Sequence, residues 1–530
     1  MRTNRSKGRR LLLSLCTTAL VASVVVAPSS GERAREGGTF LIAGTLDAID
    51  PATAIDAAGV LHATCAQLMS YPDRPLTRVT HVVPEVAARE PVISKDGRTY
   101  TFSIRKGFRF NTGEGVTAAS FSRAIDRVLN PAMKSPSVQS VIDIVGSQAV
   151  LDGKATHASG VTARANTLTV RLKRAAGDFT SRVATFPFCA VPTDLPIDPE
   201  GIGAPFPGAG PYYVAAFVPG ESFVLKRNPY YRGSRPHHVD EFDASVAADP
   251  VAAIKASQAD WADLGPLDLV GLEPRYRPQV HLLSGMTIRF VTLNSARPLF
   301  KDNVALRQAV NFAIDRAALI AARGGPSTGP PNDQYLMPAM PGFDDARIYP
   351  LARPDLARAK ALAKGHTRGG KATLYIKDSP VDIAQGQILQ RDLKPIGITV
   401  VVKKFPGPQL FQQLFTPGSH YDMALNGIGV DYLDPYGMLN VLFDGRLIGT
   451  PVSFNLAHFD SPEYNAKLTA ASKLTGAARF VAYGKLDVDL VRNAAPVAAY
   501  QTESAATFVS SRVGCVVVNP YLDLAAVCLK

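Results

Sequence analysis

The sequence has 530 residues, of which 46% are hydrophobic and 19% charged, with 42 glycines and 40 prolines. This length exceeds what one hydrophobic core usually serves, and the composition excludes a disordered or fibrous chain, so we expect a globular protein of two or more lobes. The formal net charge is +12, but the chain shows no dense basic run beyond its first ten residues, which argues against nucleic-acid binding.

The N-terminus has the pattern of a secretory signal peptide. A basic stretch precedes an apolar run from Leu11 to Ala27, and small and polar residues follow up to Gly31. We expect residues 1–31 to direct export to the periplasm or the cell-envelope exterior and to be removed. An uncleaved membrane anchor is the alternative, because the run approaches the length of a membrane span. Cys16 follows Leu15 instead of a small residue, so lipidation is not expected.

Four cysteines follow the signal peptide, an even number in a chain bound for an oxidising compartment. We therefore expect two disulfides. Of the three pairings we favour Cys65 with Cys189 and Cys515 with Cys528, the second of which closes a short loop. Four free buried thiols are the alternative.

The first half of the chain mixes short strands and helices. Alternating apolar residues predict strands at 39–44 and 99–104 and a strand pair between 161 and 172. Residues 212–217 and 223–225 are expected to form a hairpin around Pro219-Gly220. Helices are expected at 52–69, 117–130 and 251–259, the second capped by Thr117 and ended by Asn130-Pro131.

In the second half, strands alternate regularly with helices. A strand at 286–293 leads into a helix expected over 303–322, where apolar residues recur at helical spacing. The pattern then predicts helices at 355–364, 381–393 and 409–414, and strands at 372–376, 399–402 and 422–425. Such alternation predicts a partly parallel α/β lobe.

Patterns typical of enzymes and metal sites are weak. Residues 325–329 match the G-x-S-x-G pattern of serine hydrolases, but a helix precedes them and Pro330-Pro331 follows, where a nucleophile turn requires strand then helix. His237 and His238 are adjacent and lack partners at metal-ligand spacing. The carboxylates show no paired arrangement; those considered are Asp243, Glu273, Asp378 and Asp382. We expect no catalytic residue, no metal and no cofactor.

Five strings, in order along the chain, resemble one known family. They are residues 84–87 with 96–105, residues 107–110 with 113–117, residues 208–212 with 227–229 and 231, residues 293–294, 298–300 and 302 with 307–309 and 313–316, and residues 421–422 with 427 and 431–435. Together they resemble the extracytoplasmic solute-binding proteins of family 5, which serve oligopeptide, dipeptide and nickel ABC importers.

The resemblance implies a two-lobed α/β fold of the periplasmic-binding-protein type (class II) with an inserted third subdomain in lobe I. It places lobe I at 37–75, 206–285 and 493–530, the inserted subdomain at 76–205, and lobe II at 286–492. The implied function is capture of a peptide-like or other small solute between the lobes and its delivery to ABC permease and ATPase subunits. We expect a monomer that reaches the membrane only through that partner or an uncleaved N-terminal segment.

One position is carried over from the peptide binders as ligand-facing. The acidic residue of their last motif pairs with the ligand's amino group and corresponds to Asp431, for which capping of the following turn is the alternative. Ile428 stands where the family tends to have Trp, and Leu425 where an Arg can occur, so a less charged solute is left open. Further wall candidates by position are Thr45, Asp47, Asn455, Tyr500 and Gln501.

Two other functional classes stay open at this point. A secreted hydrolase would use the cleft between the lobes, and turnover of a peptide or ester would identify it. A sensor that presents its solute to a receptor would share every sequence feature with an importer component, and only its partners would distinguish it.

Overall fold

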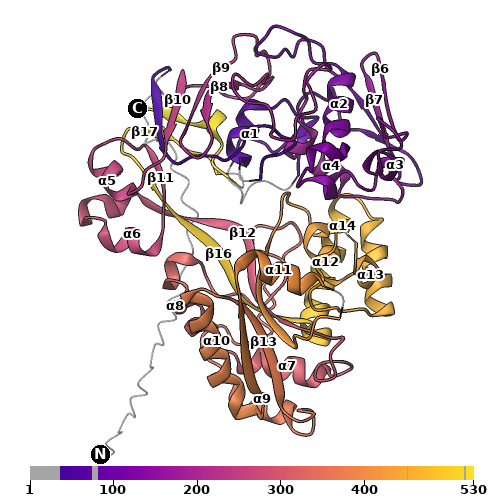
Figure 1. The fold of residues 1–530 in the computed structure, drawn as a ribbon, viewed down its shortest axis with the longest axis vertical. Helices are drawn as coiled ribbons and strands as arrows, with labels where there is room; N and C mark the ends of the chain where they lie inside the picture. The colour runs from indigo at the N-terminus through magenta and orange to yellow at the C-terminus, as the bar shows by residue number, and fades with distance from the viewer. Residues whose placement is uncertain (1–35, 56, 75–80, 417, 451, 519–520) are drawn as a thin grey trace, which may run out of the picture.

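The computed structural model describes residues 36–530 except for 56, 75–80, 417, 451 and 519–520, so the predicted signal peptide and Cys16 lie outside the described residues. Figure 1 shows two lobes joined by two long strands, β12 (Val280–Leu293) and β16 (Val497–Val509). The fold is therefore a two-lobed α/β fold, as predicted. Among the described residues, no helix combines the length and the apolar character that crossing a membrane requires.

A single ten-stranded sheet passes through both lobes, in the order β14-β13-β15-β12-β16-β11-β1-β10-β9-β8. β12 and β16 are antiparallel, from Val280 opposite Phe508 to Thr292 opposite Val497. Their register shifts between Ser284 and Ile288 and again after Arg289. Because such bulges disrupt the hydrogen-bond ladder and bend the strands, the connection between the lobes has a built-in irregularity.

The upper lobe is the part of the sheet from β11 to β8 together with the elements packed on it. It comprises β1 (Thr39–Ala43), β8 (Tyr212–Val218), β9 (Ser222–Arg227), β10 (Glu241–Ser245), β11 (Trp261–Leu264), β17 (Val513–Cys515), β18 (Cys528–Leu529), α1 (Ala58–Thr64), α5 (Pro250–Lys255) and α6 (Pro266–Gly271). β1 pairs in parallel with β10 and β11, and β8 with β9 forms the predicted hairpin. The predicted helix over 52–69 is wrong in length, because Asp50 accepts from the Ala52 N–H and fixes a turn before α1.

A separate core lies in the inserted subdomain, beside the upper lobe. Its elements are β3 (Val83–Pro84), β4 (Val92–Ile93), β5 (Thr99–Ser103), β6 (Val161–Arg164), β7 (Thr167–Arg171), α2 (Ala118–Leu129), α3 (Ser147–Leu151) and α4 (Phe179–Arg182). β2 (Met69–Ser70), from the preceding segment, pairs with β3. Thr117 caps α2 as predicted, in a capping box with Ser120. Phe102, Phe121 and Leu168 are fully buried between the β4-β5-β7-β6 sheet and α2.

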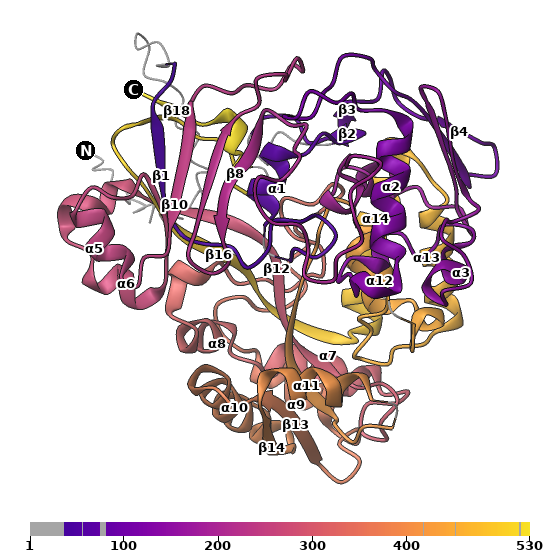
Figure 2. The same ribbon diagram turned by 45° about the horizontal axis from the view of Figure 1, so that its top comes forward.

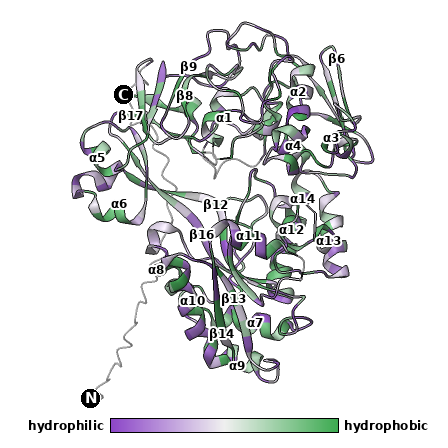
Figure 3. Ribbon diagram, viewed as in Figure 1, coloured by the Kyte–Doolittle hydropathy of each residue, from purple (hydrophilic) through white to green (hydrophobic). Residues whose placement is uncertain are grey.

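The lower lobe holds the largest core. Its elements are β13 (Lys371–Lys377), β14 (Thr399–Phe405), β15 (Met423–Gly429), α7 (Val304–Ala313), α8 (Arg316–Ala322), α9 (Leu356–Ala363), α10 (Pro380–Leu393), α11 (Gly407–Phe415), α12 (Tyr436–Phe443), α13 (Pro462–Ser472) and α14 (Gly476–Asp489). β13 is parallel to β14 and β15, as predicted. Figure 2 shows α7 to α11 gathered around these strands, and the mixed colours of these helices in Figure 3 show their amphipathic character.

The predicted single helix over 303–322 is wrong. The chain leaves the helical conformation at Ile314, and Asp315 starts a second helix by accepting a hydrogen bond from the Ala318 N–H at 2.9 Å. The Asp315 N–H in turn donates to Asp392 at 2.8 Å. A buried carboxylate from α10 therefore satisfies a main-chain donor that a continuous helix would have bonded internally.

Both predicted disulfides are present. Cys65 and Cys189 lie 5.3 Å apart at Cα and join the end of α1 to the inserted subdomain. Cys515 and Cys528 lie 5.0 Å apart and join β17 to β18. The alternative of four free thiols is therefore wrong.

Candidate functional site

A cavity of about 760 Å³ lies between the inserted subdomain and the lower lobe. The inserted subdomain contributes polar and charged residues to its wall, including Gln139, Lys173 and Arg174. The lower lobe contributes the end of β15 and the residues that follow it, from Gly427 to Tyr432. A cavity of this size matches the range of small-molecule binding sites, which often lie between domains.

β15 delivers Asp431 to this cavity. The strand is antiparallel to β12, and a Cβ at Gly427 would stand 2.6 Å from Arg289 Cδ, so glycine lets this arginine lie against the strand. Two residues after the strand ends, Asp431 reaches the point where the large cavity meets two smaller ones of about 110 and 80 Å³. Strand geometry thus carries one carboxylate to the junction of three cavities.

The Asp431 carboxylate has no hydrogen-bond or ion-pair partner among the described residues. Its side chain is exposed to the cavity, and burial among the surrounding walls raises the pKa of its carboxyl. The turn-capping role that sequence left open belongs to Asp434, whose Oδ1 accepts from the Tyr436 N–H at 2.9 Å. Asp431 is therefore available to a cation from outside the protein.

The opposite wall carries two cations. The Arg174 guanidinium donates to the Tyr436 hydroxyl and stands 5.5 Å from the centre of that ring, and Lys173 Nζ donates to the Ile142 carbonyl at 2.9 Å. Neither side chain pairs with a carboxylate of the described residues, whereas Arg182 is bound by Asp143 at 2.8 Å. Arg174 and Lys173 are both exposed. The cavity therefore offers positive charge on one wall and a carboxylate on the other.

No pattern in the sequence predicted this cationic wall. Lys173 and Arg174 follow β7 in the inserted subdomain, far along the chain from Asp431, and no spacing or motif marks them. Exposed basic residues after a strand are common, and only the folding of the inserted subdomain over β15 turns these two toward a cavity.

Apolar residues complete the cavity wall. Ile428, Val441 and Phe454 line it, and Phe411 from α11 is half exposed beside them. Leu425, by contrast, is buried in the lower-lobe core and lines none of these three cavities. Of the two departures from the family pattern, the one at Ile428 therefore bears on the solute.

The remaining wall candidates lie away from these three cavities. Thr45 is half-buried, and Asp47 is exposed in the upper lobe. The Asn455 side chain donates to the Phe459 carbonyl at 2.8 Å and accepts from the Phe459 N–H. The Tyr500 hydroxyl accepts from Gln385, and the Gln501 amide donates to the Thr328 carbonyl. Contact of these residues with a solute stays a prediction.

The residues that matched enzyme or metal-site patterns in the sequence make local hydrogen bonds and ion pairs. Ser327 Oγ donates to the Gly324 carbonyl at 3.2 Å, at the end of a short 3₁₀ helix. His237 contacts the Arg235 carbonyl while His238 contacts Glu36, so the two rings have different neighbours. Glu273 pairs with Arg275, and Asp378 with Lys404.

Comparison with known proteins gives one consistent match. Residues 81–449 match the family model described as bacterial extracellular solute-binding proteins, family 5 middle. The chain is 27% identical over 427 residues to Protein XP55 of Streptomyces lividans, covering 74% of this chain and 70% of that protein. It is 25% identical over 446 residues to the periplasmic oligopeptide-binding protein OppA of Escherichia coli, covering 79% of each chain.

Solved structures agree in fold. The clavulanic acid biosynthesis oligopeptide binding protein 2 superposes with a TM-score of 0.80 at 24% identity, covering 94% of this chain and 96% of that one. The unliganded open form of the periplasmic murein tripeptide binding protein MppA has a TM-score of 0.75 at 21% identity, covering 94% and 99% of the two chains. At these identities the structures show the shared two-lobed fold.

Proposed function

Since the chain belongs to family 5 of the bacterial extracellular solute-binding proteins, we propose that it captures a peptide-like solute with a cationic amino end and hands it to an ABC importer. Solute binding outside the cytoplasm is the function of the family. The finer elements of the proposal are the peptide-like solute, the permease and ATPase partners, the monomeric state, and a location in the periplasm or at the exterior of the cell envelope.

The single observation that carries the proposal is the unpartnered carboxylate of Asp431 at the junction of the cavities. An ammonium placed there forms a charge-assisted hydrogen bond in a partly desolvated site. Such bonds contribute more than neutral ones because the cavity walls exclude much of the water that would screen them.

The opposite wall extends the proposal to the other end of the solute. Arg174 and Lys173 can receive a carboxylate, while Phe411, Val441 and Phe454 offer apolar contact to side chains between the two charged ends. These features together favour a short peptide or a related zwitterion. The names of similar proteins include binders of oligopeptides and, in Haemophilus influenzae, of heme.

The proposed binding motion is closure of the two lobes over the solute. We propose lobe I at 37–75, 206–285 and 493–530, the inserted subdomain at 76–205, and lobe II at 286–492. The register shifts of β12 and β16 near Ile288 support a hinge at the boundary between lobe I and lobe II at residues 285 and 286, because strands often bend at a bulge. The importer would then distinguish the closed form from the open one.

The test is calorimetric titration of a peptide library into the solute-free protein. Asp431→Asn should weaken binding of the best peptide by about 10-fold to 100-fold, the range expected for loss of a hydrogen bond to a charged group. Asp378→Asn is the matched control, because Asp378 lies in the same lobe, pairs with Lys404 and is away from the cavity. Equal affinity of Asp431→Asn and the wild type would remove the amino-end assignment.

Two further measurements address the other functional classes. Mass spectrometry of the solute after incubation should return it unchanged, whereas a cleaved product would identify a hydrolase. Uptake of the labelled solute by cells should require both this protein and its permease, and uptake without the permease would favour a sensor.

A further inference from the structure

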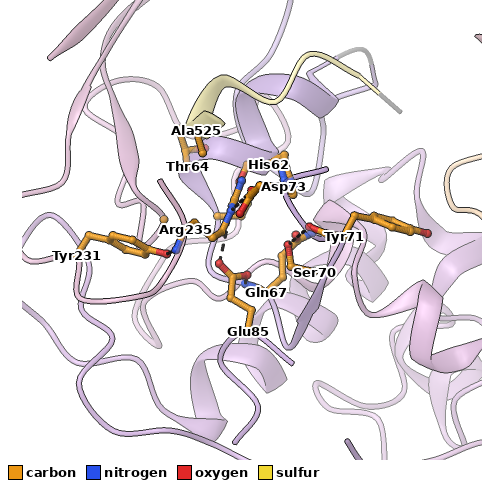
Figure 4. A network of polar contacts seen from close by, with 12 residues as sticks. His62, Thr64, Gln67, Ser70, Tyr71, Asp73, Glu85, Tyr231, Arg235 and Ala525 are labelled. Atoms are coloured by element: carbon orange, nitrogen blue, oxygen red, sulfur yellow. Dashed lines mark hydrogen bonds and ion pairs between the residues drawn. The ribbon is translucent and has the colours of Figure 1, made fainter. Parts of the chain in front are cut away.

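A buried polar cluster between the upper lobe and the inserted subdomain makes none of the proposed solute contacts. It comprises His62, Asp73, Glu85, Arg235 and Asp523, here called the His62 cluster, and Figure 4 shows its labelled members around Arg235. His62 lies on α1, and Asp523 caps the C-terminal 3₁₀ helix (Leu524–Ala526). Three separate stretches of the chain, at 62–85, 235 and 523, therefore bring an imidazole, a guanidinium and three carboxylates together.

Two atoms of the cluster face each other without a hydrogen bond. His62 Nε2 and Asp523 Oδ2 lie 3.8 Å apart, and neither has a hydrogen-bond partner in the part of the chain that the structure describes. Both side chains are fully buried. This separation is too long for a hydrogen bond but suits two ligands of one ion at about 2 Å from each.

The third potential ligand is Asp73. One ligand atom each of His62, Asp73 and Asp523 lie within 4.8 Å of one another. Asp73 Oδ1 and Asp523 Oδ1 lie 3.5 and 3.4 Å from the Arg235 guanidinium, so one arginine holds both carboxyls beside His62. The Asp73 side chain is 23% exposed, so an ion has a route from solvent.

With its three carboxyls ionised and His62 neutral, the cluster has an excess of negative charge that a bound cation would offset. Asp73, Glu85 and Asp523 carry three negative charges when ionised, and Arg235 supplies one positive charge. A divalent cation bound beside a neutral imidazole brings the sum to zero. Buried charges are retained only when they are paired or bind metal.

Outer contacts hold the remaining atoms in place. Asp523 Oδ1 accepts from the Ala525 N–H at 3.1 Å and lies 3.4 Å from Arg235, which leaves Oδ2 as the free oxygen. Gln67 Nε2 donates to the Ala184 carbonyl at 2.7 Å, and among the described residues its Oε1 has no hydrogen-bond partner. Neighbouring groups that orient a carboxylate in this way are typical of metal sites.

We propose that His62, Asp73 and Asp523 bind a divalent transition-metal ion, with Zn²⁺ as the probe. Mixed imidazole and carboxylate ligands suit zinc and its neighbours. The ion would tie α1 to the C-terminal segment directly behind the small cavity that His62, Tyr521 and Asp431 line. It would thereby stiffen the upper-lobe wall of the solute site. The proposal does not depend on the identity of the solute.

The test uses untagged protein, stripped with a chelator and titrated with ZnCl₂ in a calorimeter. One ion per chain should bind, and Co²⁺ in its place should give absorption bands typical of nitrogen and oxygen ligands. His62→Gln and Asp523→Asn should each weaken Zn²⁺ binding by roughly 100-fold or more. The matched control is His157→Gln, because His157 pairs with Asp126 at 2.9 Å on the surface and should bind zinc no differently from the wild type.

Several results would overturn the proposal. They are absence of a stoichiometric ion, a Co²⁺ spectrum of the free aqua ion, equal Zn²⁺ affinity of His62→Gln and the wild type, or loss of binding in His157→Gln. Circular dichroism of the metal-free variants shows whether they fold. If they do not fold, the stoichiometry and the Co²⁺ spectrum of the wild type still decide.

Discussion

Arg479, on α14, donates two hydrogen bonds to the Asp434 carboxylate, from Nη2 to Oδ1 at 2.6 Å and from Nε to Oδ2 at 3.2 Å. Both side chains are buried, and Asp434 lies three residues after Asp431. The segment that presents Asp431 to the cavity is thus anchored to the body of the lower lobe by an ion pair that lines none of the three cavities.

Loss of the ion pair between Arg479 and Asp434 should destabilise the folded protein. Arg479→Met leaves the Asp434 carboxylate buried without its partner, and we expect the free energy of unfolding to fall by about 3–5 kcal/mol. Chemical denaturation measures it. Lys404→Met is the control, because the pair of Lys404 with Asp378 is half exposed on both sides and should contribute less than about 1 kcal/mol. Equal effects of the two substitutions would contradict the anchoring role.

Asp431 should make the solute-free protein less stable as the pH rises. Because burial raises its pKa in the folded state, the folded protein keeps this proton to higher pH than the unfolded chain does. Stability is therefore lost as the pH rises from the unfolded pKa through the folded one. Asp431→Asn should melt at a higher temperature than the wild type at about pH 7, and at the same temperature at about pH 3. A lower melting temperature of the variant at neutral pH would contradict this.

The two disulfides should differ in their effect on stability. Cys65 and Cys189 are 124 residues apart in sequence, and Cys515 and Cys528 are 13 apart. In the chain-entropy account, replacing the first pair by serine lowers the free energy of unfolding by about 5 kcal/mol, and replacing the second by about 3 kcal/mol. Denaturation of the two double variants, each against the oxidised wild type, measures the difference. A larger effect from the short loop would reject the entropic explanation.

Replacing Gly484 in α14 with alanine should destabilise the protein, although this substitution usually stabilises helices. Alanine exceeds glycine in helix propensity by about 1 kcal/mol, yet a Cβ at Gly484 would stand 2.0 Å from the Gly342 carbonyl oxygen. Gly484→Ala should therefore destabilise the protein by about 1–3 kcal/mol. Gly386→Ala in α10 is the control, because its Cβ would meet Val402 at an ordinary 3.4 Å and should be neutral or stabilising. Stabilisation by Gly484→Ala would disprove the close approach.

Sequence predicted those parts of the fold whose causes are local. The Thr117 cap of α2, the hairpin of β8 and β9 and the alternation in β5 each depend on residues close together in the chain. The break between α7 and α8 was missed because it depends on Asp392, a distant carboxylate on α10. Helical periodicity continues through Asp315 and carries no sign of that contact.

The residues of the candidate site likewise include some that the sequence predicted and some that it did not. Asp431 was predicted because it lies in a motif that resembles a known family, whereas Arg174 has no motif and meets the cavity only through tertiary folding. The His62 cluster is an extreme case, since His62 and Asp523 come from opposite ends of the described chain. Single residues of common types, far apart in sequence, give no periodicity from which their meeting could be inferred.

The strand β1 and the C-terminal residue Lys530 both belong to the upper lobe, where the Lys530 N–H donates to the Arg512 carbonyl. A sensor chip coupled to the protein through Lys530 would therefore hold that lobe, and the proposed closure would move the other lobe about β12 and β16. A dye on the lower lobe would report each capture event optically, so the layout of this fold lends itself to a reagentless detector of its own solute.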